Sequence, residues 1–209
     1  MRTKSEAYTS ARREEIIVAC AALYETMSFR EITLKEISEY TSFSRPSIYN
    51  YFQTKEEIFL ALLQKEYELW IEDLNALTEA HDHLTTDALA SALAESLIRR
   101  ERLLKLMSMN HFDMEENARM ERLVEFKTAY GNSIRAVERM VEKFCPVMAA
   151  EDRREFLYMF FPFIYGIYPY TVVSDKQREA MEQAGTGFFY HSIYDLTYPF
   201  VKKLLEAYV

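Results

Sequence analysis

Glycine and proline are scarce in this chain of 209 residues, which has only four glycines and five prolines. A glycine-rich loop that cradles phosphate groups therefore has too little glycine to be built from, which argues against a nucleotide-binding loop of that kind. Leucine, alanine, glutamate and methionine are plentiful instead, and no segment alternates apolar and polar residues as a half-buried strand would. The composition predicts an all-α fold.

Cysteine is almost absent as well. Cys20 and Cys145 lie far apart in apolar surroundings, so they form neither a disulfide framework nor a CxxC metal site, and we expect buried thiols in a reducing cytoplasm. The first ten residues, MRTKSEAYTS, are polar and resemble no secretory signal peptide. These observations predict a cytoplasmic protein.

Charge is missing from one stretch, the 18 residues FLYMFFPFIYGIYPYTVV at 156–173, which just reaches the length of a membrane span. Two prolines, a glycine and four tyrosines interrupt it, and such residues are unusual at mid-depth in a lipid-facing helix. We therefore expect a buried helix here and no membrane partner.

Catalytic signatures are lacking too, since the chain contains no GxSxG, HExxH or paired Glu-x-x-His motif. His81 and His83 are two residues apart, a spacing that does not place both rings on one helical face, and no cysteine is near them or near His111. We expect no catalytic residues, no metal site and no cofactor, so the protein is predicted not to be an enzyme.

Acidic charge dominates, with a net charge of -8, but it is unevenly placed. Residues 1–65 contain nine basic and nine acidic side chains and are neutral, which leaves 16 basic and 24 acidic side chains in the remainder. The acidity of the whole chain therefore does not exclude a nucleic-acid partner for the N-terminal part.

Residues 16–58 predict three helices, the first of about four turns and the third short, and the start of a long fourth one. Apolar residues recur at helical spacing from Ile16 to Met27; Thr33 and Glu36 have the spacing of a capping box; and Ser44 is a candidate N-cap with Pro46 in the following first turn. A second capping-box pattern, Thr54 to Glu57, opens the long helix. The second and third helices, joined by a short turn, predict a helix-turn-helix.

The predicted recognition helix has two different faces. Its inner face, with Ile37 of the preceding helix, contains Phe43, Ile48 and Phe52. The outer face offers Arg45 and Asn50 for base edges, Ser47 for polar contacts, and the rings and hydroxyls of Tyr49 and Tyr51 for phosphates or a thymine methyl. Two helices are predicted to begin at Thr33 and Thr54, with Lys35 and Lys55 beside these positions. Both helix N-termini are expected to hold phosphates.

The segment ITLKEISEYTSFSRPSIYNYFQTKEEI, residues 32–58, resembles the DNA-binding signature of the TetR family of transcriptional regulators. The resemblance implies an N-terminal three-helix helix-turn-helix domain, which we place at 1–53, and a larger helical regulatory domain at 54–209. It also implies DNA contacts by Thr33, Lys35, Arg45, Pro46, Ser47, Tyr49, Asn50 and Lys55; with Ser44 and Tyr51 from the residue pattern, these are the predicted DNA-binding residues. Ser28 and Ser42 stand where the family usually has glycine, which predicts a slightly altered turn.

For the larger domain, the resemblance implies dimerisation and a small-molecule pocket. Its last two helices are rich in phenylalanine and predict a homodimer interface, which would let two recognition helices read a palindromic double-stranded DNA operator. The predicted effector-binding residues are Trp70, Met107, Phe112, Tyr130 and Tyr165, a set suited to an apolar or aromatic ligand. The chain is thus expected to be a repressor that a ligand releases from DNA. One alternative is a DNA-binding protein of the same fold that is regulated by a protein partner or is constitutive. A less favoured alternative is a helical enzyme or a membrane-surface protein.

Overall fold

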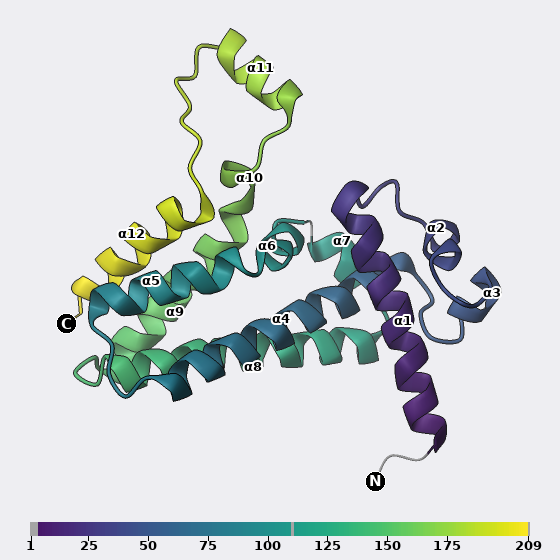
Figure 1. Ribbon diagram of the computed structural model, residues 1–209, viewed down its shortest axis with the longest axis horizontal. Helices are drawn as coiled ribbons and strands as arrows, with labels where there is room; N and C mark the ends of the chain where they lie inside the picture. The colour runs from purple at the N-terminus through teal and green to yellow at the C-terminus, as the bar shows by residue number, and fades with distance from the viewer. Residues whose placement is uncertain (1–3, 110, 209) are drawn as a thin grey trace. The chain divides into compact units, whose positions relative to one another are not determined.

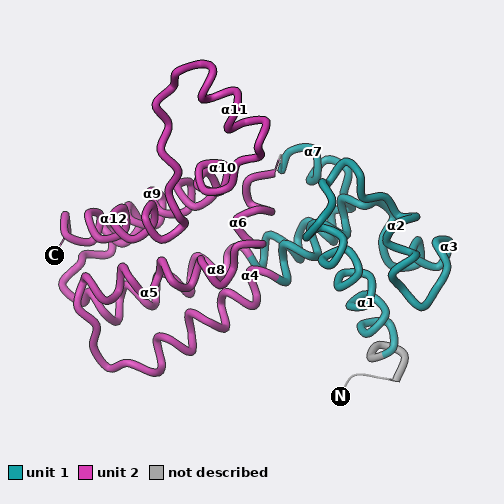
Figure 2. The backbone as a smooth tube through the Cα atoms, turned by 45° about the horizontal axis from the view of Figure 1, so that its top comes forward, with its two compact units in different colours: residues 1–65, 110–129 teal, residues 66–109, 130–209 magenta. Residues whose placement is uncertain are grey.

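The computed structural model describes residues 4–109 and 111–208, and within these ranges the regular structure is helical, without a strand. This confirms the predicted all-α class. Contacts divide the chain into two compact units, residues 1–65 with 110–129 and residues 66–109 with 130–209 (Figure 2). The first unit extends beyond the predicted domain 1–53, because segments near residues 60 and 120 pack with it.

The first unit contains the predicted helix-turn-helix. It consists of α1 (Lys4–Thr26), α2 (Leu34–Glu39), α3 (Arg45–Ile48), the first part of α4 (Lys55–Ala80), α7 (His111–Glu116) and the first part of α8 (Met120–Phe144). Its core contains fully buried side chains from each of the first four helices and the turn after α3: Ile16, Cys20, Ile37, Ile48, Phe52, Ile58 and Phe59. The N-terminal three-helix arrangement predicted from the sequence is confirmed.

The second unit is also helical and has an aromatic core. It combines the rest of α4 and α8 with α5 (Thr86–Ile98), α6 (Glu101–Met107), α9 (Ala150–Gly166), α10 (Tyr168–Thr171), α11 (Asp175–Gln183) and α12 (Ile193–Glu206), as Figure 1 shows. Trp70, Leu93, Leu97, Val137, Phe156 and Phe160 are completely buried.

Helix α12 lies along α5, and polar contacts tie the two together. The Tyr198 hydroxyl donates to Asp87 over 2.6 Å, Lys202 forms an ion pair with the same carboxylate, and the hydroxyls of Ser91 and Tyr194 are 3.0 Å apart. The carboxylate's pKa is lowered chiefly by the hydrogen bonds from Lys202 and Tyr198. The last helix is thereby held on the body of its own unit.

A short break separates α7 from α8. Helix α7 ends at Glu116, residues 117–119 follow, and α8 begins at Met120. Side chains distant in sequence bind the exposed backbone groups there: Thr54 donates to the Asn117 carbonyl over 3.0 Å, and Glu57 accepts from the Arg119 amide over 3.0 Å. Helical periodicity contains no information about such partners.

Helix α11 lies in the segment between α10 and the last helix, α12. The helix begins with a capping box in which Ser174 and Gln177 bind each other's backbone amides. This Ser-x-x-Gln pattern was the available sequence signal.

The uncharged stretch 156–173 is divided between α9 and α10 at Ile167. Phe156, Phe160, Phe161 and Ile164 of α9 are buried, as expected of a core helix. Among the described helices none combines the length and the apolarity needed to cross a bilayer.

Candidate DNA-binding surface and effector site

The recognition helix α3 has a polar outer face and a buried apolar inner face. Ile48, together with Phe52 just after the helix and Ile37 of α2, has no exposed surface. Arg45, Pro46, Tyr49 and Asn50 are exposed, as is Ser44, while Ser47 and Tyr51 are half-buried. The two faces therefore separate as the sequence pattern predicted, apart from Phe43, which is only half-buried.

Helix α3 begins at Ser44 with Pro46 in its first turn. The Ser44 hydroxyl makes no cap bond to the backbone and instead lies 3.2 Å from the Ser47 hydroxyl. One turn further on, Arg45 Nη2 is 3.4 Å from the Tyr49 hydroxyl, so the guanidinium and phenol meet on the outer face. Both groups present donors to solvent, which suits contacts to phosphate oxygens or to guanine.

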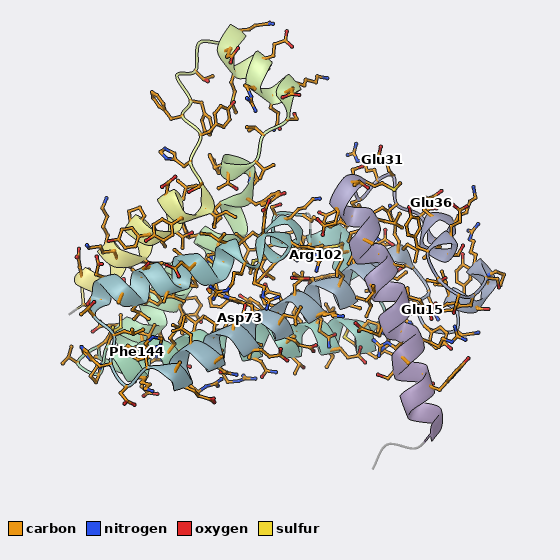
Figure 3. All side chains as sticks on the ribbon, in the orientation of Figure 1. Glu15, Glu31, Glu36, Asp73, Arg102 and Phe144 are labelled. Atoms are coloured by element: carbon orange, nitrogen blue, oxygen red, sulfur yellow. The ribbon has the colours of Figure 1, made fainter. Side chains whose placement is uncertain are left out.

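Ser42, in the turn between α2 and α3, is held by α1. Its backbone amide and its hydroxyl are bound by Glu15 and Arg12: the amide donates to the Glu15 carboxylate, and Arg12 Nη1 donates to the hydroxyl over 2.6 Å. The hydrogen bond from the Ser42 amide is the main cause of a lowered pKa at Glu15, which lies on α1 (Figure 3). The Arg12 guanidinium also lies 4.9 Å from the ring centre of Phe43.

The two serines that replace the family's usual glycines do not require glycine's backbone freedom. Among described residues, positive φ occurs only at Gly185 and Gly187. Ser28 begins its turn in another way, with both its amide and its hydroxyl donating to Glu31 over 2.8 and 2.7 Å. Side-chain hydrogen bonds thus fix both turns.

At the start of α2, Thr33 caps the helix by accepting from the Lys35 amide over 3.2 Å, and its hydroxyl donates to Glu36. The expected cap bond was to the third amide, so the cap forms one residue earlier. Lys35 has a side chain that is 68% exposed, and its ammonium group lies 3.7 Å from Glu39. That exposure leaves it accessible to a phosphate.

Lys55 is placed differently. Its ammonium donates to the backbone carbonyls of Phe29 and Ile32 over 2.7 and 3.2 Å and lies 4.1 Å from the ring centre of Phe29. An ammonium has three donors, so these two bonds leave one for a phosphate. Through its bonds to the Phe29 and Ile32 carbonyls, the side chain holds the loop before α2 against the start of α4.

A buried ion pair fixes the first turn of α4. Glu57 has no exposed surface, and its carboxylate accepts from Arg119 Nε and Nη2 over 2.7 and 2.9 Å and from the Gln53 amide over 2.8 Å. Burial by itself would raise the pKa of this carboxyl, but the hydrogen bonds from Arg119 and Gln53 outweigh it and lower the pKa. The carboxylate therefore stays charged in the interior.

In the second unit, three tyrosines meet beside the single tryptophan. The hydroxyls of Tyr67 and Tyr165 are 2.8 Å apart, and the Tyr130 ring lies 5.8 Å from that of Tyr67 and 6.3 Å from that of Tyr165. Phe161 connects the group to Trp70, with ring centres 5.8 Å from Tyr130 and 6.2 Å from Trp70. We call these five residues the tyrosine cluster.

Three polar groups of the tyrosine cluster have hydrogen-bond partners: the Tyr67 and Tyr165 hydroxyls bind each other, and the Trp70 indole binds Ser96. The Trp70 indole donates to the Ser96 hydroxyl over 3.0 Å. Burial raises the pKa of Tyr67 well above its ordinary value, with further contributions from Tyr165 and Tyr130, so the phenol is neutral at physiological pH. Neutral phenols are able both to donate and to accept hydrogen bonds.

Of the predicted effector residues, the structure brings Trp70, Tyr130 and Tyr165 together, and it buries Met107 in α6. It does not bring in Phe112, which belongs to the first unit and is 83% exposed. Tyr67 and Phe161 were not predicted; Tyr67 lies one turn before Trp70 on the same helix, which was the available signal. Within residues 4–109 and 111–208, no group of three metal-binding side chains exists.

Sequence comparison assigns both parts of the chain. Residues 16–62 match the family described as bacterial regulatory proteins, tetR family, and residues 64–190 match the tetracyclin repressor-like C-terminal domain. The chain belongs to the TetR family. As a TetR-family protein it is a relative of transcriptional regulators, as the resemblance of residues 32–58 predicted.

Individual relatives are distant. The regulator RutR of Escherichia coli K12 is 27% identical over 70 residues, which are 34% of this chain and 33% of RutR, so the chain matches about a third of the length of that curated relative. A putative TetR-family regulator from Mesorhizobium loti has a TM-score of 0.58 at 18% identity, covering 99% of this chain and 97% of that one. FadR from Bacillus subtilis, solved with stearoyl-CoA, has a TM-score of 0.58 at 15% identity, with 94% and 98% covered. The structural likeness shows a shared TetR-family fold.

Proposed function

We propose that this TetR-family protein is a DNA-binding repressor that binds a palindromic operator as a homodimer and is released by a small apolar or aromatic effector. The observation that carries the proposal is the recognition helix: its base is fully buried while Arg45, Tyr49 and Asn50 remain exposed together on its outer face. A surface helix with these side chains has the donors that major-groove recognition needs.

The proposed DNA contacts are of two kinds, those to base edges and those to the DNA backbone. Arg45 and Asn50 are assigned to base edges, because their side chains form the bidentate pairs that distinguish guanine and adenine. The remaining predicted residues are assigned to the DNA backbone or to the shape of the contact: Thr33, Lys35, Ser44, Pro46, Ser47, Tyr49, Tyr51 and Lys55. Among them, Lys35 is the exposed cation, and Lys55 contributes through its one remaining donor.

Dimerisation is assigned to α9 and α12. Tyr158, Met159 and Pro162 form an exposed stripe on α9, and Phe163 continues the stripe to Phe200 of α12, with the two rings stacked at 3.8 Å. We call these five residues the α9–α12 face. An apolar surface of this kind on two adjacent helices suits a symmetric four-helix interface. A dimer would bring two recognition helices to half-sites about 34 Å apart.

The effector is assigned to the tyrosine cluster, with Met107 as an adaptable apolar neighbour in the same unit. The rings offer aromatic faces, and the linked hydroxyls of Tyr67 and Tyr165 offer a polar group that a ligand is able to displace or bind. Phe112 is left out of this assignment because it is exposed and lies in the other unit. A ligand that binds better to the DNA-free state would lower operator affinity by linkage.

The main alternative keeps the same DNA-binding function but replaces the effector by a protein partner, or by no regulator. It predicts that no small molecule changes the fluorescence of Trp70, the chain's one tryptophan. Titration of apolar and aromatic compounds, with stearoyl-CoA included because FadR is solved with it, distinguishes the two readings. The test for the effector is a saturable emission change that Tyr165→Phe weakens, together with release of DNA.

DNA binding is tested by selecting fragments of the source genome with purified protein and comparing variants on the best fragment. Arg45→Ala should lower affinity by about 1–3 kcal/mol and relax one base position. Arg99→Ala, which removes an exposed arginine directly after α5, is the matched control and should have little effect. Lys35→Ala should reduce the salt slope by about one. Failure to enrich any palindromic fragment at moderate salt would refute the repressor proposal.

A further inference from the structure

Between α9 and α12 the chain makes an excursion, residues 168–192, which we call the arm. It contains α10 and α11, and Figures 1 and 2 both show it extending from the α9 and α12 side of the second unit, away from α4 and α8. None of its 25 residues is buried. Its exposed apolar side chains include Tyr170, Val172, Phe189 and Tyr190, with exposed fractions of 58%, 45%, 78% and 42%.

Several contacts within the arm join its residues to one another. The Phe188 ring lies 6.2 Å from Tyr170 and 5.2 Å from Tyr190, and Arg178 lies 5.6 Å from the centre of the Tyr190 ring. Gly185 and Gly187, with φ near +60°, form the turn that follows α11. Glycine adopts this φ without the steric cost that other residues have, so both positions of the turn favour glycine.

Such an arm is too small to be stable by itself. Helix α11 has nine residues and buries none of them, whereas isolated helices shorter than about 12–15 residues are marginal in water. The capping box at Ser174 and Gln177 and the ring contacts help, but a helix in a folded protein draws most of its stability from a packed face. The arm therefore needs a surface to pack on.

We infer that the arm packs on the partner subunit of the homodimer, so that each protomer holds its neighbour by an exchanged pair of arms. The inference rests on the proposed dimer through the α9–α12 face. The arm leaves the end of α9 and re-enters at the start of α12, and it is therefore continuous in the chain with both helices of that face. In a two-fold dimer, a segment projecting beside the shared face meets the second copy, and the second copy's arm meets the first.

The chemistry agrees with this occupant. The arm offers aromatic rings at Tyr170, Phe189 and Tyr190, and the α9–α12 face offers Tyr158, 80% exposed, and Met159, 40% exposed. Thioether and aromatic side chains pack favourably on rings. Joined to the α9–α12 face, the arm would enlarge the contact between two copies without any further partner.

The first test places a photo-crosslinking amino acid at position 189 in the full-length protein. Dimers are mixed from unlabelled and 15N-labelled chains, and mass spectrometry separates crosslinks within one chain from those between two. We expect crosslinks between chains, mapping to residues of the second unit. The matched control has the same group at position 112, another exposed aromatic outside the arm, and should give no comparable product.

The second test measures the dimer dissociation constant by sedimentation. Tyr170→Ser with Phe189→Ser should raise it about tenfold or more, since each loses aromatic burial across the interface. Val147→Ser, an exposed apolar residue outside the arm and the α9–α12 face, should change it less than twofold.

The outcomes separate the two proposals. If the unmodified protein is monomeric at all concentrations, the dimer and the exchanged arms both fail. If it is dimeric but position 189 crosslinks only within its own chain, or only to a different protein, the arm inference fails while the dimer stands. Crosslinks between chains together with a weakened dimer in the double variant support exchange.

Discussion

Arg119→Met tests the buried ion pair that fixes the first turn of α4. The substitution keeps an apolar stem of similar length but removes the hydrogen bonds from Nε and Nη2 to Glu57, at 2.7 and 2.9 Å. The carboxylate retains two backbone donors, from Gln53 and from residue 119 itself. It therefore remains in place with half of its hydrogen bonds.

The expected loss follows from these bonds. Hydrogen bonds to charged groups contribute about 1.5–3 kcal/mol each, so two would contribute about 3–6 kcal/mol. Because the Arg119 side chain is 34% exposed, water replaces part of the lost interaction, and we expect a loss of about 3 kcal/mol at neutral pH. The assay is urea unfolding followed by circular dichroism at one fixed protein concentration, since the apparent stability of the proposed dimer would depend on concentration.

The pH dependence supplies a second check with a fixed sign. The folded protein lowers the pKa of Glu57, so its contribution is present above the unfolded value of about 4.3 and is lost as pH falls through the lower folded value. The difference between the parent protein and Arg119→Met should therefore shrink in acid.

Arg154→Met is the matched control, because Arg154 is 61% exposed and pairs with an exposed Glu151 at 2.8 Å. Such surface pairs contribute about 0–1 kcal/mol. If Arg119→Met cost no more than this control, or if its cost were the same at pH 3 and pH 7, the reasoning about Glu57 would be wrong.

Three further predictions concern single side chains. Lys55→Met should lower the free energy of unfolding by about 2 kcal/mol because it leaves two backbone carbonyls without their partner, and an unchanged free energy of unfolding would contradict this structural role. Ser96→Ala should cost about 1–3 kcal/mol by leaving the Trp70 indole N–H unpaired, and an unchanged urea midpoint would contradict that hydrogen bond. Burial raises the pKa of Cys20 to about 12. In a Cys145→Ser background, Cys20 should therefore react with a thiol reagent at pH 8 only when the protein unfolds. Rapid labelling of the folded protein would disprove the burial of Cys20.

Sequence reasoning worked best where the signal is local. The two faces around Ile48, the caps at Thr33 and Thr54 and the position of Pro46 depend on residues within one or two helical turns, and each appears in the structure. The all-α class follows for the same reason, because helical periodicity is local. The cap at Thr33 differs only in which amide it binds.

It worked less well where the partner is distant in sequence. The phosphate contact of Lys55 stays a prediction, but its two carbonyl partners, which precede it by 23 and 26 residues, were not predicted. The interruption before α8 likewise depends on Thr54 and Glu57, more than 60 residues earlier. The sequence did not reveal that Tyr67 lies beside Tyr165, because a buried tyrosine near Trp70 has the same pattern as ordinary core.

The Ser42 turn has a consequence for engineering. In a turn built on glycine, the conformation is encoded by the residue itself, so the segment would retain its shape when moved to another scaffold. Here the shape depends on Glu15 and Arg12, which a transplanted segment of residues 32–58 would leave behind. A chimaeric regulator that contains this recognition helix should therefore include α1 from the same chain, because α1 fixes the turn that positions the recognition helix.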